Sequence, residues 1–286
     1  MKKSAIIILS FLILMLSFSG CEAIESKKDT SKKTVAVSIT PQSTFVTKVC
    51  GDKFKVVTII PAGASPETYE PSPAKMKEIS DAEIYFSIGI PAEENSILPV
   101  INEGTETVAL HTKVREVYPD RTEDGGRDPH IWLSPKRVIV MITYIADTFK
   151  EIDPKNAEFY ETNANEYIKE LKNLDSYINT ALADSKNRKF IAFHPAFGYF
   201  AEDYSLSMYA LEEHGKEATA KRLAEMTDLA KKENIKVIFY QAEASKKQAL
   251  TFAEEIGGEA VMLEPLSLDY LENIKSMTDS LAKAMK

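Results

Sequence analysis

The chain has 286 residues, a length that suits about two domains. Its 35 basic and 43 acidic side chains give a formal charge of −8, so it lacks the basic excess that nucleic-acid binding needs. Hydrophobic residues make up 44% and charged residues 27%, which excludes a wholly disordered chain. Neither GxGxxG nor GxxxxGKS/T occurs, so no motif supports nucleotide binding.

The N-terminus, residues 1–20, is predicted to be a signal segment outside the fold. Lys2 and Lys3 precede an apolar stretch that is shorter than the roughly 20 residues of a membrane-spanning helix. The stretch closes with small residues directly before Cys21, which resembles a bacterial lipobox. That resemblance implies cleavage before Cys21 and diacylation of its sulfur; a plain secretory signal is the alternative. Residues 21–33 are predicted to be a flexible tether, and the protein to be extracytoplasmic and lipid-anchored, on the outer face or the periplasmic side of a membrane.

Strands and helices are expected to alternate after the tether. Apolar and β-branched runs predict strands at 34–39, 54–60, 82–88 and 107–110. Helical spacing predicts helices at 45–49, 73–80 and 134–151. Ser134 can cap the last of these, with Pro135 at its first position. Polar residues 115–127 are expected to form a surface loop, and Cys50 to be a buried thiol on a helix face.

The longest helical pattern begins at Pro154 and runs to about Ser185 without an internal glycine or proline. About 30 helical residues would span roughly 45 Å. The apolar stripe is too irregular for a coiled coil, so we interpret the segment as a rigid spine between two lobes.

The second half repeats the alternation. Strands are expected at 189–193, 235–240 and 259–263, and helices at 218–233, 246–256 and 269–285. Such alternation predicts the α/β class, with parallel sheets in two (β/α) lobes joined by the long helix. The expected boundaries are 34–152 for the N-terminal lobe, 153–186 for the spine and 187–286 for the C-terminal lobe.

Four acids and histidines stand at or beside the carboxyl ends of predicted strands, where open α/β sheets bind ligands. They are Glu67, His130, His194 and Glu264. Imidazole and carboxylate suit zinc, and also manganese or iron. Taken singly, each has a simpler explanation: a solvated acid, a turn cap, a satisfied strand-end histidine and a carboxylate that accepts helix N–H groups.

Five segments, in chain order, resemble the metal-binding substrate-binding lipoproteins of ABC transporters, represented by the zinc-uptake binding proteins. They are PAGASPETYEPSP, DPHIWLSP, FHPAFGYFAEDYSL, VIFYQAE and LEPLSLDYLENI. The resemblance covers about residues 34–286 and implies that a metal is clamped in a cleft between the lobes. By position, His130 and His194 match family ligands, and Glu264 stands where the family usually has an aspartate before Pro-Leu.

Glu67 is the main departure, because the family segment usually reads Pro-His-x-Tyr-Glu-Pro and this chain has glutamate at the histidine position. A second carboxylate ligand moves the metal preference of the site somewhat toward manganese or iron, although zinc tolerates two histidines with two carboxylates. Glu243 is a nearby acid that could orient or replace a ligand. His214 is a weaker candidate for an auxiliary ligand, and His111 is expected on the surface.

The resemblance implies a binding protein rather than an enzyme. It would capture a divalent metal ion, zinc first and manganese or iron as alternatives, and deliver it to a membrane permease with its ATPase. A monomer is expected, and the affinity should fall below about pH 6 because the histidines must be neutral to bind. The alternatives are a surface adhesin or interaction lipoprotein of the same fold, and an extracytoplasmic metallohydrolase.

Overall fold

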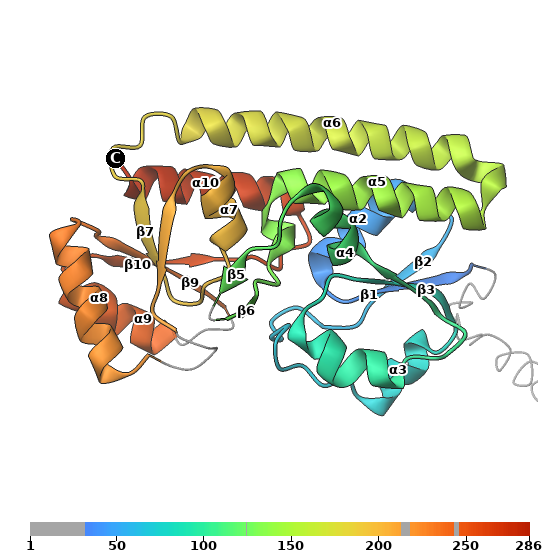
Figure 1. Ribbon diagram of the computed structural model, residues 1–286, viewed down its shortest axis with the longest axis horizontal. Helices are drawn as coiled ribbons and strands as arrows, with labels where there is room; N and C mark the ends of the chain where they lie inside the picture. Colours follow the sequence, from blue (N-terminus) through green and yellow to red (C-terminus); the bar gives the residue numbers. More distant parts are fainter. Residues whose placement is uncertain (1–31, 124, 213–217, 243–245) are drawn as a thin grey trace, which may run out of the picture. The chain divides into compact units, whose positions relative to one another are not determined.

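The computed structural model describes residues 32–123, 125–212, 218–242 and 246–286 (Figure 1). Three predicted features lie outside the described residues: the signal segment with Cys21 and nearly all of the tether, His214, and Glu243. Residues 33–286 form one compact unit. Within the described part of the chain, no helix is both long and apolar enough to cross a membrane.

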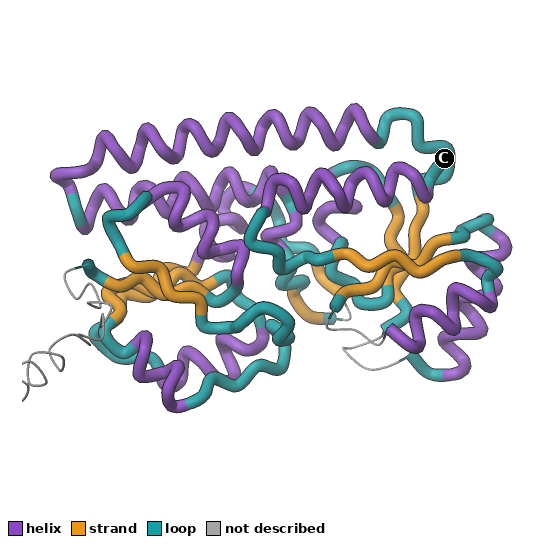
Figure 2. The backbone as a smooth tube through the Cα atoms, turned by 180° about the vertical axis from the view of Figure 1, so that it is seen from behind, coloured by secondary structure: helices purple, strands orange, loops and turns teal. Residues whose placement is uncertain are grey.

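The first half of this unit is built on a parallel four-stranded sheet in the order β2-β1-β3-β4. Its strands are β1 (Thr34–Val37), β2 (Lys55–Thr58), β3 (Ala82–Ser87) and β4 (Glu106–Ala109). Its helices are α2 (Thr40–Cys50), α3 (Pro73–Ile79), α4 (Leu110–Val117) and α5 (Pro135–Ile152). The central strands β1 and β3 are almost wholly buried, as expected for a sheet with helices on both faces (Figures 1 and 2).

The second half has a parallel four-stranded sheet in the order β10-β9-β7-β8. Its strands are β7 (Lys189–Ala192), β8 (Ser207–Ala210), β9 (Val237–Gln241) and β10 (Glu259–Leu263). Its helices are α7 (Gly198–Asp203), α8 (Ala220–Lys232), α9 (Lys246–Glu255) and α10 (Tyr270–Ala284). The predicted α/β class with a parallel sheet in each of two lobes is therefore confirmed.

The long helix is α6 (Ala157–Ala181), with 25 residues. It packs against α2 and α5 of the first half and against α10 of the second half, so it contacts both lobes (Figure 1). It is shorter than the predicted segment at both ends. A 3-10 turn occupies Pro154–Asn156, and the Arg188 guanidinium donates to the Leu182 carbonyl just beyond the last turn.

Two short regions differ from the prediction. The helix α7 and the strand β8 lie where no element was expected, because six and four residues are too few to show a period. The segment expected as a surface loop is partly regular. Its first residues complete α4, and β5 (Thr122–Glu123) pairs antiparallel with β6 (Gly126–Arg127).

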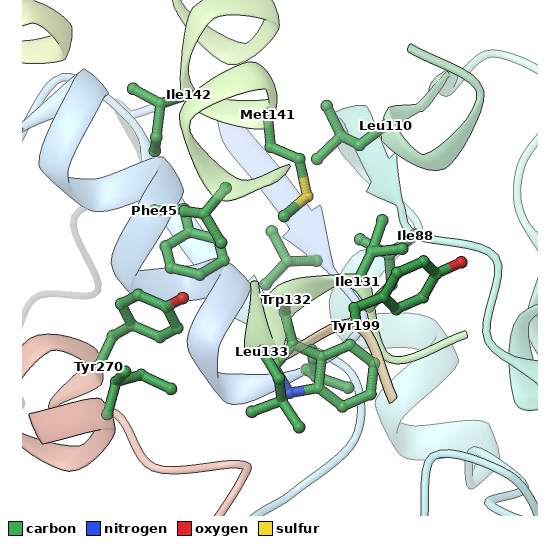
Figure 3. Packing of buried hydrophobic residues seen from close by; sticks show 14 of the residues in the cluster. Phe45, Ile88, Leu110, Ile131, Trp132, Leu133, Met141, Ile142, Tyr199 and Tyr270 are labelled. Carbon is green, nitrogen blue, oxygen red and sulfur yellow. The ribbon is translucent and has the colours of Figure 1, made fainter. Parts of the chain in front are cut away.

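One hydrophobic core runs through both halves of the unit. Phe45 of α2 meets Tyr270 of α10 edge to face, with ring centroids 4.9 Å apart (Figure 3). Trp132, which is fully buried, donates its indole N–H to the Pro265 carbonyl at 3.0 Å. Cys50 is a buried free thiol on α2, as predicted. Packing between the two halves thus forms the base of the cleft between them.

A buried ion pair also joins the halves. Arg137 of α5 lies 2.9 Å from the Asp203 carboxylate of α7, and their side chains are 3% and 9% exposed. The Arg137 guanidinium stacks on the Tyr199 ring at 4.3 Å. Ser134 caps α5 by accepting the Arg137 backbone N–H, as predicted, and its hydroxyl also contacts Asp203.

We expect Arg137→Met to lower the free energy of unfolding by about 3–5 kcal/mol, because Asp203 would remain buried without its partner. Urea unfolding of the metal-free protein measures this. The double variant Arg137→Met/Asp203→Leu should recover part of the loss, because it leaves no buried charge unpaired. A single variant as stable as the wild type would show that the ion pair does not hold the lobes together.

Candidate metal centre

Three of the four predicted ligands meet in one pocket of about 230 Å³. Glu67 lies in the loop after β2, His130 directly precedes the 3-10 turn Ile131–Leu133 that leads into α5, and His194 follows β7. The pocket therefore takes two of these residues from the first lobe and one from the second. His194 stands at the carboxyl end of β7, where open α/β sheets bind ligands, whereas Glu67 and His130 reach the pocket from loops of the first lobe.

Local bonds hold the Glu67 loop in place. Ser65 accepts the Glu67 backbone N–H through its hydroxyl at 3.2 Å, and the Pro66 carbonyl accepts the Ala92 N–H at 3.1 Å. The neighbouring Glu93 carboxylate is buried and accepts the backbone N–H groups of residues 88 and 89. The loop is thereby tied to the segment after β3, and the position of Glu67 follows from that tie.

The ligand atoms have the spacing of a metal site. His194 Nε2 lies 3.1 Å from Glu67 Oε1 and 3.2 Å from His130 Nε2. One donor atom from each of the three residues falls within 4.8 Å of the others. Zinc bonds of about 2.0–2.1 Å in a tetrahedron place neighbouring ligand atoms about 3.3 Å apart. The two separations from His194 Nε2, 3.1 Å and 3.2 Å, thus match the edge of a coordination tetrahedron.

Two carboxylates orient the imidazoles. Asp128 Oδ1 lies 2.8 Å from His130 Nδ1, and Glu212 Oε2 lies 2.7 Å from His194 Nδ1. Each ring can donate its Nδ1–H to a carboxylate and turn the Nε2 lone pair toward the pocket, which is the usual support of a metal-binding histidine. Sequence reasoning missed both acids. Asp128 could have been found in Asp-Pro-His, whereas Glu212 is 18 residues from its partner and gave no local signal.

Asp128 is itself held firmly. Its side chain is 1% exposed, and it lies 2.9 Å from Arg121 Nη1. Burial alone would raise the pKa of the Asp128 carboxyl, but the hydrogen bonds to His130 and the charges of His130 and Arg121 lower it. A Cβ at Gly198 would lie 2.4 Å from Arg121 Nη1 and 2.5 Å from Asp128 Oδ2. Glycine at this position is what lets the ion pair pack there.

Carboxylates surround His194 on two sides. Burial alone would lower the pKa of its imidazolium, but the hydrogen bonds and charges of Glu212 and Glu67 raise the pKa from 6.5 to about 9. The hydrogen bond to His194 in turn lowers the pKa of Glu67. The metal-free protein at pH 7 therefore carries a proton on His194. The expected threshold of about pH 6 is too low for this residue.

The structure does not bring Glu264 to the other three. Its side chain is exposed, and it is not among the described residues whose ligand atoms cluster in the pocket. The reason is its strand: β10 is the sheet edge and β9 separates it from β7, so the two strand ends lie about 10 Å apart. The following residues, Pro265 and Leu266, line the pocket in its place, with the Pro265 carbonyl bound to Trp132.

His111 is half-buried on α4 rather than on the open surface. Its ring packs against Gly89, and its buried Nδ1 has no hydrogen-bond partner among the described residues. Burial and the nearby Arg127 charge lower the pKa of His111 to about 4. It does not belong to the ligand cluster.

Zinc affinity should rise with pH up to about pH 9, by about tenfold per unit, because each bound ion displaces the proton of His194. The stability of the metal-free fold has the opposite pH dependence and falls as the pH rises. A raised pKa means that protonated His194 stabilises the fold below about pH 6.5, and that this contribution is lost as the pH rises through about 9. Chelator competition between pH 6 and 9 measures the affinity. A constant affinity above pH 7 would contradict the prediction.

Glu212→Gln should lower the pKa of His194, because the charge beside Nδ1 is removed while the side chain keeps its size. Zinc affinity should fall by about 10- to 100-fold, as is usual when the partner of a metal-binding histidine is lost. NMR titration of His194 and chelator competition measure the two effects. Glu254→Gln, on an exposed position of α9, is the matched control and should change neither.

A family model, "Zinc-uptake complex component A periplasmic", matches residues 35–284. Zinc-binding protein AdcA of Streptococcus pyogenes serotype M1 is 30% identical, over 93% of this chain and 56% of that protein. The chain thus spans about half the length of the AdcA relatives. The high-affinity zinc uptake system protein ZnuA of Bacillus subtilis (strain 168) is 27% identical, over 99% of this chain and 98% of that protein.

Solved structures agree with these relatives. A crystal structure of ZnuA has 34% identity and a TM-score of 0.84, over 89% of this chain and 100% of that one. The Zn(II)-bound ZnuA-like domain of Streptococcus pneumoniae AdcA has 28% identity and a TM-score of 0.75, over 89% of this chain and 99% of that one. With its fold and nearly its whole described length matched, the chain belongs to the zinc-uptake complex component A family.

Proposed function

We propose that this protein captures a divalent metal ion outside the cytoplasm and delivers it to the permease of an ABC importer. The observation that carries the proposal is the convergence of Glu67, His130 and His194, from both lobes, on one pocket. Family membership and the zinc-binding and zinc-uptake relatives support transport over the adhesin and metallohydrolase alternatives. We propose no catalytic step for this chain.

Zinc is the first choice of cargo. Two imidazole nitrogens and one carboxylate oxygen at tetrahedral spacing suit zinc, and a related domain binds it in its crystal structure. Manganese and iron are the alternatives, because Glu67 supplies an oxygen where the family usually has imidazole. The two carboxylates that line the pocket, Glu67 and Glu212, outnumber the one protonated imidazole of His194, so the pocket keeps a negative charge that attracts any of these cations.

Capture and release follow from the placement of the ligands. An entering ion displaces the proton on His194 and gains the Glu67 carboxylate as a charged ligand. Release requires that the three ligands part. Because Glu67 and His130 belong to the first lobe and His194 to the second, a permease that contacts both lobes can separate them by a small displacement.

We also propose where the protein works and with what. The lipid anchor would be at Cys21, behind a signal of residues 1–20 and a tether of residues 21–33, with a monomer held at the extracytoplasmic face. A lipoprotein name for the related AdcA of Streptococcus pneumoniae (strain ATCC BAA-255 / R6) supports the anchor. The partners would be a membrane permease and its ATPase. The domain boundaries that we propose for this chain are 34–152 and 187–286 for the two lobes and 153–186 for the spine.

Calorimetric titration of metal-free protein beginning at Glu22 tests the proposal. With Zn²⁺ we expect one site and a dissociation constant below about 1 μM. Glu67→Ala should weaken binding by at least about tenfold, since it removes a ligand and its charge. Glu70→Ala, an exposed acid in the same loop, is the control and should bind as the wild type does. The absence of tight binding for Zn²⁺, Mn²⁺ and Fe²⁺ alike would refute the proposal.

A further inference from the structure

The ligand cluster supplies three donor atoms, whereas zinc in proteins takes four. A tetrahedral site built on these three atoms would need one more ligand atom from the pocket that they line. No further histidine or acid among the described residues reaches the cluster. Something else in the pocket must therefore meet the fourth position.

The polar side chains that line the pocket beside the ligands differ in what they already bind. Ser65 accepts the Glu67 N–H, and Glu212 accepts the His194 Nδ1–H. Thr68 is exposed to solvent. Gln241 alone among these is buried, at 7% exposure, with its amide nitrogen lacking a hydrogen-bond partner in the described structure.

The position of Gln241 explains how it comes to the pocket. It is the last residue of β9, which lies directly between β7 and β10 in the sheet. His194 follows the neighbouring end of β7, where the Phe193 N–H bonds to the Phe239 carbonyl. Gln241 therefore lies at the same end of the sheet as His194, where the carboxyl ends of β7 and β9 meet. A buried amide without a hydrogen bond costs free energy, and such a group in a native protein often binds a water molecule or an ion.

We propose that the Gln241 side-chain amide holds a water molecule in the fourth coordination position of the captured metal ion. This inference rests on the proposed function. The amide gives the water a fixed hydrogen-bond partner, while Glu67, His130 and His194 bind the ion directly. Gln241 is thus a positioning residue that acts through the water. The cargo would be bound as a mono-aquo ion, with one ligand that can be exchanged without opening the lobes.

Cobalt(II), whose visible absorption reports its coordination, tests the inference in the otherwise complete protein. In the wild type, azide should displace the water and shift the cobalt spectrum. Gln241→Met, which matches the length of glutamine but cannot hydrogen-bond, should weaken Zn²⁺ binding by about 10- to 100-fold and change the azide affinity. Gln241→Glu can still hydrogen-bond the water and should retain Zn²⁺ binding. Thr251→Val, at an exposed position of α9 outside the pocket lining, is the control and should leave both readouts unchanged.

Several results would overturn the inference. A wild-type cobalt spectrum that azide does not shift would mean that a protein atom, such as the Gln241 carbonyl oxygen, fills the fourth position. Gln241→Met with unchanged zinc and azide affinity would remove the amide from the site. Equal weakening in Gln241→Met and Gln241→Glu would assign the effect to packing. Wild-type protein that binds neither Zn²⁺ nor Co²⁺ would instead refute the proposed function itself, so the two failures are distinguishable.

Discussion

The hydrogen bonds from two imidazoles to two carboxylates determine what the pocket can bind. Asp128 on His130 and Glu212 on His194 each occupy Nδ1, so both rings turn Nε2 toward the same point. Either ring without its acid could rotate or change tautomer, and the tetrahedral spacing would be lost. The cost of burying Asp128 is offset by Arg121, whose close approach depends on Gly198. The positions of the two histidines thus depend on residues that do not themselves face the pocket, namely Asp128, Arg121 and Gly198.

The scaffold makes this arrangement rigid by joining the lobes beneath the cleft. The core is continuous through Phe45 and Tyr270, the indole of Trp132 reaches across to Pro265, and Arg137 pairs with Asp203 out of water. The long helix α6 contacts both halves as well. Ligands contributed by separate lobes are therefore held at a fixed spacing, which lowers the reorganisation that metal binding requires.

Much of the fold followed from apolar runs and helical spacing, since both sheets, the long helix and the Ser134 cap lie close to where the pattern predicted them. The strand-end rule also selected Glu67, His130 and His194, which meet in the pocket. The same rule does not distinguish a central strand from an edge strand, so Glu264 looked equivalent although β10 lies at the edge. Glu212 and Gln241 depend on strand order and long-range pairing, which no local pattern encodes.

The contact between Phe45 and Tyr270 has a consequence for kinetics. Wide spontaneous opening would have to separate these rings and expose the core between them, so thermal fluctuation would open the cleft far only rarely. A bound ion would then have a long residence time, even at modest equilibrium affinity. In the proposed transport role, unloading would be work that the docking partner performs on this protein, and part of the energy of transport would go into deforming the carrier rather than into moving the ion.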